Sequence, residues 1–410
     1  MSVSVTKSGF NVREKLKQLQ KPIGLKGSEL MRAETAQEAR DFVSAGRKNL
    51  IINGGMEVSQ RGTGAGNAAS AGQVVSCDQW KSWINGSGGS GAAFTLQQEF
   101  SVIPDNFITS LKVNQTGTAT LSSSQYNLVA NYIEGYRIAH LGFGTAAAKT
   151  VTLSFWIRSS ITGTFGGALS NGAQNRSYPF SYTIDNVNTW ERKKITIPGD
   201  TTGTWARDNS RGFLIFFSLG TGPGYSGPEG VWAGATYLSV TGVNNWVGQS
   251  STFYLTGVQL EVGKNATEFE HRSYGEELAL CQRYYYRVYG GRYEWRSSDY
   301  TTYRNGSLGS GSHPVTMRQA PTMGHNLTGD STNINPSTVA SPVGAWSWYS
   351  WATGWGTSSS INSGTIANWG LDPTTNGWAG GIYYISPSNY SHVTHMQISS
   401  QSYIEASAEL

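Results

Sequence analysis

The residue types that usually perform catalysis are sparse in this sequence and poorly spaced. No Gly-x-Ser-x-Gly occurs, and a Gly-x-Gly-x-x-Gly stands at residues 222–227. Its Pro223 leaves no helix whose N-terminus could hold a phosphate, so we predict a turn there. Asp330 and Asp372 are the only charged residues between 319 and 404. We predict that the chain is not an enzyme, and glycoside hydrolysis by this carboxylate pair stays an alternative.

Metal-ligating residues are also widely separated. Cys77 and Cys281 have no second thiol at the spacing of a metal site, and we expect two buried thiols. His392 and His395 lie three residues apart. On a strand that begins at His392 they fall on opposite faces, so one chain cannot use both for one metal. We expect no cofactor, and a metal on a symmetry axis with one His from each subunit stays open.

Aromatic residues offer a different chemistry near the C-terminus. Half of the 14 Trp follow residue 286, and residues 319–404 contain no Lys or Arg. Flat rings beside neutral hydrogen-bonding side chains suit sugars, whereas charged groups would be costly to desolvate there. The alternative is that the rings fill the domain's own core or a subunit interface. The predicted ligand-binding residues are Trp346, Trp348, Tyr349, Trp351, Trp355, Trp369 and Trp378.

The first 48 residues carry the basic charge of the chain. They hold ten Lys and Arg against five Asp and Glu, and apolar residues repeat in them at helical spacing. Thr35 and Glu38 form a capping box that opens a second short helix. Two short helices are marginal in water, so we expect this segment to dock on another protein or on the downstream domain. The predicted docking residues are Val12, Leu16, Leu19, Ala39 and Val43.

Composition narrows the fold and the partners. Charged residues make up 14% and Gly 51 of 410 residues, which disfavours solvated helical bundles, and 12% aromatics disfavour disorder. The basic segment has only Phe10 and Phe42 as rings for stacking on bases, so we expect no nucleic-acid partner. No apolar run is long enough to span a membrane, and the first residues lack a signal peptide, so we expect cytosolic folding without membrane insertion.

From Asn49 onward the apolar period is two, as in half-buried antiparallel strands. Residues 252–262 change phase at Gly257, which predicts a bulge. Other strands are expected at 151–158, 181–185, 191–197, 212–219, 291–296, 382–386 and 393–398. The predicted fold is mainly β: a short helical N-terminal segment (1–48), a jelly-roll β-sandwich (49–273), a linking helix (274–287) and an aromatic-rich, β-rich tip domain (288–410).

Several segments resemble the tail-fibre proteins of bacteriophages and prophages. NLIINGGMEVSQRG (49–62) is similar to the opening motif of their carbohydrate-module-like jelly roll, and CDQW (77–80) to their Asp-x-Trp element. VTLSFWIR (151–158), with Trp190 ahead of its strand, resembles the middle of that domain. The longest match is GVQLEVGKNATEFEHRSYGEELALCQRYYYR (257–287).

The two ends of the chain resemble the same family. Ala408, Glu409 and Leu410 are similar to the family's usual ending, and RAETAQEARDFVSAGRKN (32–49) resembles the fibre N-terminus of short-tailed, T7-like phages of marine cyanobacteria. The resemblance implies a homotrimeric fibre on the virion tail, assembled in the host cytoplasm. Residues 1–48 would dock on a tail, adaptor or nozzle protein, and 288–410 would bind a cell-surface polysaccharide or an outer-membrane receptor.

Two other functions stay open. The sequence lacks the coiled-coil or collagen-like shaft of long fibres, so the chain could be a short or side fibre, or a collar or tail adaptor component that contacts only virion proteins. The third hypothesis is a glycan depolymerase.

Overall fold

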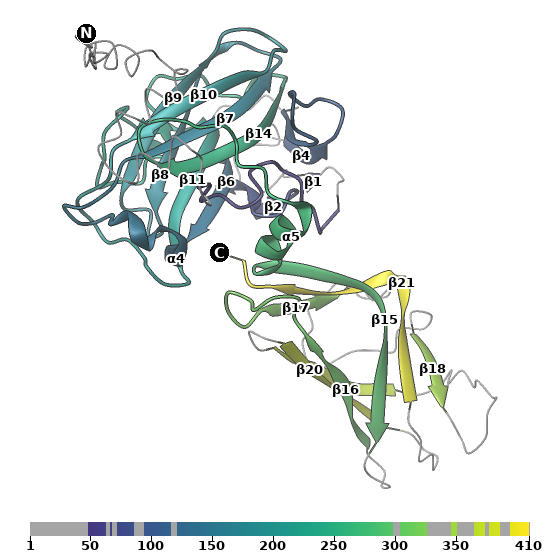
Figure 1. The fold of residues 1–410 in the computed structure, drawn as a ribbon. Coiled ribbons are helices and arrows are strands. Elements are labelled where there is room, and N and C mark those ends of the chain that lie inside the picture. The colour runs from purple at the N-terminus through teal and green to yellow at the C-terminus, as the bar shows by residue number, and fades with distance from the viewer. Residues whose placement is uncertain are drawn as a thin grey trace, which may run out of the picture.

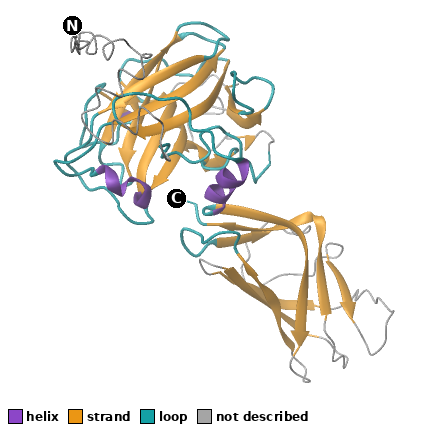
Figure 2. Cartoon of the chain, in the orientation of Figure 1, coloured by secondary structure: helices purple, strands orange, loops and turns teal. Residues whose placement is uncertain are grey.

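Strands dominate the part of the chain that the computed structural model describes (Figure 2). The described residues are 48–62, 66–67, 72–85, 94–115, 121–297, 304–325, 346–350, 365–373, 377–385 and 394–409. The predicted mainly-β fold class is confirmed. The N-terminal helical segment lies outside these residues, and so do its predicted docking residues Val12, Leu16, Leu19, Ala39 and Val43.

Two antiparallel six-stranded sheets form a jelly-roll sandwich (Figure 1). The first sheet has the order β1 (Gly66–Asn67), β4 (Phe94–Glu99), β5 (Ser110–Gln115), β14 (Ser251–Val262), β7 (Val151–Ser159) and β10 (Glu191–Ile197). The second has the order β2 (Gly72–Val75), β3 (Trp80–Asn85), β6 (Tyr126–Glu134), β11 (Arg211–Thr221), β8 (Gly163–Asn171) and β9 (Ser177–Ile184). The short α4 (Gly135–Ile138) and 3-10 helices at Ala139–Leu141 and Pro223–Tyr225 lie between strands, and β12 (Ser226–Gly227) pairs in parallel with β13 (Ser239–Val240).

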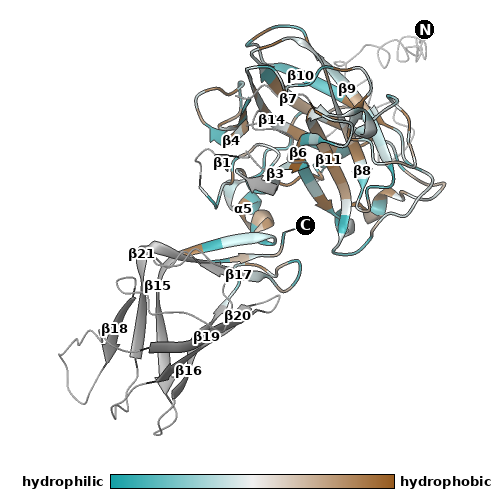
Figure 3. Cartoon of the chain, turned by 180° about the vertical axis from the view of Figure 1, so that it is seen from behind, coloured by the Kyte–Doolittle hydropathy of each residue, from teal (hydrophilic) through white to brown (hydrophobic). Residues whose placement is uncertain are grey.

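Alternation of apolar residues explains the core between the sheets. Val151, Leu153 and Phe155 of β7 are buried there, as the period of two predicts. In β11 the alternation breaks down because both faces are covered: Phe217 lies in the core between the sheets, while Phe216 packs in a second apolar cluster outside them. Figure 3 shows the resulting apolar colour along β6 and β11. The strand predicted at 212–219 is confirmed.

The bulge predicted at Gly257 is present. The pairing of β14 with β7 shifts between Thr256 and Gln259, and Gly257 has a φ of 60°. A Cβ at this position would lie 2.6 Å from the Phe107 ring. Glycine is therefore required both for the left-handed backbone and for the close approach of this ring.

A helix, α5 (Tyr274–Gln282), connects the sandwich to a second sheet (Figure 1). Its strands are β15 (Tyr285–Ser297), β16 (Arg304–Ser312), β17 (Thr322–His325), β18 (Trp346–Ser350), β19 (Thr365–Pro373), β20 (Gly377–Ile385) and β21 (Thr394–Ser407). The order is β17-β21-β15-β16-β20-β19, with β18 also on β21. The outer strands β17 and β19 contact one another, so the sheet curls toward closure.

The linking helix is shorter than the predicted 274–287. The Ser273 hydroxyl caps its first turn by accepting from the Glu276 N–H, but the helix ends at Gln282. Tyr285 is instead the first residue of β15, which pairs antiparallel with β21, so that Tyr285 lies opposite Ser407. The aromatic run Tyr284–Tyr286 favours a strand, and this distant partner completes it.

Cys77 and Cys281 are free thiols, and both are fully buried. Burial raises the pKa of both thiols well above its ordinary value. The expectation of two buried thiols is confirmed. Within the described residues, no helix has the length and apolar character needed to cross a membrane.

Candidate functional site

The segments that resemble phage fibres meet at one end of the sandwich. The Asn53 side chain donates to the carbonyls of Val58 and Asp78, at 2.8 Å each, and accepts from the Val58 N–H. The Trp80 indole N–H donates to the Asn53 carbonyl at 2.8 Å, and the Asn53 N–H donates to Glu277 of α5. All these groups are buried. This geometry gives the motifs a structural role, because it leaves no surface for a ligand.

The chain enters and leaves the sandwich at this same end. Backbone N–H groups of Lys48 and Asn49 donate to the Glu270 carboxylate at 2.6 and 2.7 Å, and Arg272 donates to the Asn49 carbonyl. Since α5 begins at Tyr274, entry and exit are adjacent. The sandwich is therefore attached at this end, and the described residues show no such attachment at its other end, which we call the free end.

A second set of charges attaches the end of the chain to the sandwich. Glu409 pairs with Lys81 of β3 at 2.8 Å and with Arg61 at 3.1 Å. Glu134 of β6 accepts two hydrogen bonds from Arg283, at 2.9 and 2.6 Å. The residues just before and after the C-terminal sheet are thus both fastened to the sandwich.

Asp78 is buried close to these charges, and burial raises its pKa to about 6, although hydrogen bonds from Gln60 oppose the shift. An unfolded Asp titrates near pH 3.9, so between about pH 4 and 6 the folded state keeps a proton that the unfolded state has released. The contribution of Asp78 to the free energy of unfolding therefore decreases as the pH rises through this window.

We expect Asp78→Asn, which cannot ionise, to gain stability relative to the wild type as the pH increases from 4 to 7. The expected gain is on the order of 2 kcal/mol. Urea unfolding at four pH values measures it, with Asp105→Asn as the control because Asp105 is exposed. A difference between wild type and Asp78→Asn that is constant across this range would contradict the expectation.

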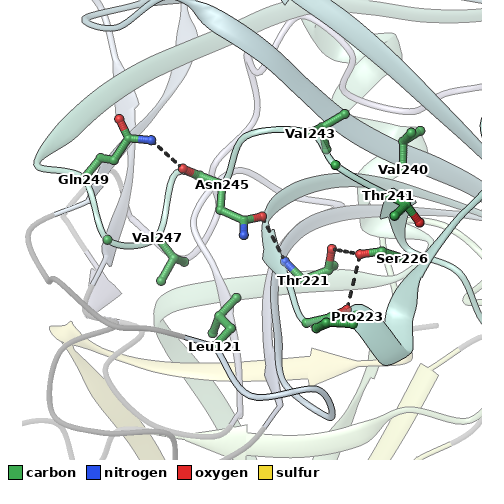
Figure 4. A pocket seen from close by; sticks show the side chains of 13 residues that line it. Leu121, Thr221, Pro223, Ser226, Val240, Thr241, Val243, Asn245, Val247 and Gln249 are labelled. Carbon is green, nitrogen blue, oxygen red and sulfur yellow. Dashed lines mark hydrogen bonds between the residues drawn. The ribbon is translucent and has the colours of Figure 1, made fainter.

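A hollow of about 460 Å³ lies at the free end of the sandwich (Figure 4). It lies beyond the last residue of β11, Thr221, whereas the first, Arg211, pairs with Glu134 at the attached end. Eleven residues of strand separate the two ends by roughly 30 Å. Its walls are the turn after β11 and the loop 241–249, and Leu121 completes its floor.

The loop that forms this hollow is held rigidly. Trp246 is 1% exposed and stacks on Phe165, with ring centroids 4.0 Å apart and an interplanar angle of 15°. On either side of it, the Asn244 N–H donates to the Thr164 carbonyl at 2.7 Å and the Val247 N–H to the Leu219 carbonyl at 2.8 Å. The hollow is thus preformed by the sandwich.

The turn predicted at 222–227 forms one wall of this hollow. Residues Pro223–Tyr225 make a single 3-10 turn with no following α-helix. The prediction of a turn is confirmed. Gly222 lets the turn pack closely against the Ser122 backbone, because a Cβ on Gly222 would lie 1.9 Å from the Ser122 carbonyl oxygen.

The register of the C-terminal sheet divides its residues between two faces. Directly paired residues of antiparallel strands share a face, and Trp346 and Trp348 of β18 pair with Ile398 and Met396 of β21. Trp369 of β19 pairs with Ile382 of β20, and Trp378 of β20 pairs with Pro373 of β19 and Gly311 of β16.

Tyr349 pairs with His395, and His395 pairs with Glu294, so these three residues form one row across β18, β21 and β15. Trp351 and Trp355 lie outside the described residues, and ligand binding by the whole set stays a prediction.

The described residues show no group of three metal-ligating side chains. Asp372 is in β19, while Asp330 and His392 lie outside the described part, so neither the carboxylate pair nor the histidine pair is brought together there.

Sequence reasoning did not find the hollow at the free end. The sequence signal for the hollow is the stretch TGVNNWVGQS (241–250), in which two Asn and a Trp stand between Gly242 and Gly248. This stretch has no strand or helix period, so the sequence predicts only a loop. The pairing of β11 with its neighbours brings this loop beside residues 221–226.

No family model and no curated protein matches this chain. Solved structures with a similar fold include the enzymatically active domain of tailspike protein 4 of bacteriophage CBA120, with a TM-score of 0.29 and 13% identity over 52% of this chain and 21% of that one. TmCBM61 in complex with beta-1,4-galactotriose has a TM-score of 0.27 and 10% identity over 53% of this chain and all of that module. The family 11 carbohydrate-binding module of a Clostridium thermocellum cellulase has a TM-score of 0.25 and 14% identity over 50% and 99%. This chain spans about a fifth of the tailspike, and scores this low carry no argument about function.

Proposed function

We propose that the chain is a fibre of a phage tail that attaches the virion to its host, with a neutral surface glycan bound by the C-terminal domain. One observation carries the proposal: residues 319–404 contain six Trp and only two charged residues. Rings beside Ser, Thr and Asn side chains fit the apolar faces and hydroxyls of sugars. The resemblance of residues 49–62 and 257–287 to phage fibres supports the virion location.

The attachment of the C-terminal sheet suits such a role. A domain that binds a cell surface has to transmit force to the rest of the particle. Arg283 with Glu134 and Lys81 with Glu409 hold both ends of the inserted sheet on the sandwich. Residues 1–48, with their excess of Lys and Arg, are then the segment proposed to dock on the tail, as one of three chains in a trimer.

Adsorption of the full-length protein to host cells tests the proposal. We expect the labelled chain to bind host cells and to block infection, and we expect Trp351→Ala and Trp355→Ala to reduce adsorption at least tenfold. Trp190→Ala is the matched control, because Trp190 is a half-buried Trp of the sandwich. A folded wild-type protein that neither adsorbs nor blocks infection would exclude the receptor role, and release of reducing sugar would favour a depolymerase.

The register supports a second candidate function, a structural component that contacts only virion proteins. Trp346 and Trp348 pair with Ile398 and Met396 of β21, and Trp369 pairs with Ile382 of β20; enclosing such apolar residues in a subunit interface would remove them from water. In that case the Trp351→Ala and Trp355→Ala variants would assemble into virions that adsorb as well as the wild type.

A further inference from the structure

We propose that the hollow at the free end of the sandwich is a second binding site, which takes a single neutral sugar ring independently of the C-terminal domain. The ligand class rests on the proposed function, but the site is argued from its own geometry. Its volume of about 460 Å³ falls in the range of small-molecule sites.

The orientation of one side-chain amide defines a hydrogen-bond donor in the hollow. The Asn245 Oδ1 accepts from the Thr221 N–H at 3.3 Å, which fixes the amide so that its Nδ2 is the group left over (Figure 4). Among the described residues, no acceptor lies within hydrogen-bond distance of this Nδ2. An Asn side chain carries two N–H donors on that nitrogen, and both are available to a ligand.

The lining also carries an acceptor at the exposed rim of the hollow. The Gln249 Nε2 donates to the Asn245 carbonyl at 2.8 Å, which leaves the Gln249 Oε1 for a ligand (Figure 4). A hydroxyl is both donor and acceptor, so one hydroxyl of a sugar ring can accept from Asn245 while another donates to Gln249.

The rest of the lining selects against charged ligands. None of the residues that line the hollow is ionisable, and its floor includes the apolar Leu121 and Val247. A sugar acid or a phosphate would lose water there without meeting a cation, which costs free energy. A neutral ring loses only hydroxyl hydration, and the two amides replace part of it.

Within the part of the chain that the structure describes, the hollow is open to solvent. The attachments through Glu134, Glu270 and Glu409 are all at the other end of the sandwich. Thr241 and Gln249 at its rim are exposed. A sugar on a cell surface can therefore reach it while the C-terminal sheet is engaged elsewhere.

Saturation-transfer NMR on the full-length protein tests this site, with galactose, glucose and glucuronate as the probes. We expect transfer to at least one neutral hexose and none to glucuronate. Asn245→Asp keeps the acceptor for Thr221 but replaces the donor with an anionic oxygen, and it should weaken binding of that hexose at least tenfold. Asn244→Asp is the matched control, because it adds the same charge at an exposed neighbour that does not line the hollow.

A second variant and a measurement of thermal stability distinguish loss of the site from loss of the fold. Gln249→Ala removes the acceptor and should also weaken the hexose at least threefold, while both variants keep the thermal midpoint of the wild type. Equal binding by Asn245→Asp and Asn244→Asp, or no transfer to either hexose, would overturn the site. If host adsorption is lost in Trp351→Ala and Trp355→Ala but not in the variants of the hollow, and no hexose binds the hollow, the proposed function is supported and this second site is excluded.

Discussion

Replacing Asn53 with alanine should destabilise the protein by about 3–5 kcal/mol. The substitution leaves the buried Val58 N–H and Asp78 carbonyl without their partner, at about 1–3 kcal/mol for each unsatisfied group. Asn53 also has a φ of 56°, in the left-handed region that Asn tolerates and Ala does not. The free energy of unfolding in urea, monitored by circular dichroism, measures the loss.

Two further variants at this position separate the contributions. Asn53→Gly removes the same hydrogen bonds but accepts the left-handed backbone, so it should be about 1 kcal/mol more stable than Asn53→Ala. Asn53→Asp keeps an acceptor for Val58 but turns a carboxylate oxygen toward two carbonyls, so it should be no more stable than the alanine variant. A loss below 1 kcal/mol in Asn53→Ala would show that the joined motifs do not stabilise the fold.

Local sequence patterns were sufficient for the strands of the sandwich. Residues 151–158 alternate because one face of β7 meets the opposite sheet, and β10 covers the predicted 191–197. The phase change at Gly257 marked a bulge because the side-chain period of a strand is fixed at two. Each of these features depends on neighbours along the chain, which a sequence shows directly.

Long-range pairing is what the sequence could not supply. Residues 285–287 belong to strand β15 and not to the linking helix because the chain returns beside them more than a hundred residues later. The hollow beside Asn245 depends likewise on loops brought together by β11.

The return of the chain also gives the C-terminal residues a structural role. Ala406 and Ala408 are buried, and the Ala408 N–H donates to the Tyr284 carbonyl at 2.7 Å. Arg318 donates to the carbonyls of Ala408 and Glu409. Packing at the attachment of the C-terminal sheet therefore accounts for these residues without a ligand.

Replacing Glu409 with glutamine should destabilise the protein by about 3–5 kcal/mol, because it removes the carboxylate that lies 2.8 Å from a buried ammonium. The side chains of Lys81 and Glu409 are 6% and 14% exposed and 2.8 Å apart. Burial lowers the pKa of Lys81 and opposes the ionisation of Glu409, yet Lys81 and Arg61 hold the pKa of Glu409 below its ordinary value. Thermal unfolding of the full-length chain measures the loss.

The double variant Lys81→Met with Glu409→Gln distinguishes an ion pair from simple packing. With both charges removed, no uncompensated ion is buried, so the double variant should recover at least half of the stability lost in Glu409→Gln. The partner Arg61 keeps a favourable environment in either case, since its guanidinium lies 3.3 Å from the centre of the Tyr285 ring. If the losses of the two single variants simply add in the double variant, the pair is not coupled, and the chain end is held by the backbone contacts of Ala408 and Arg318 alone.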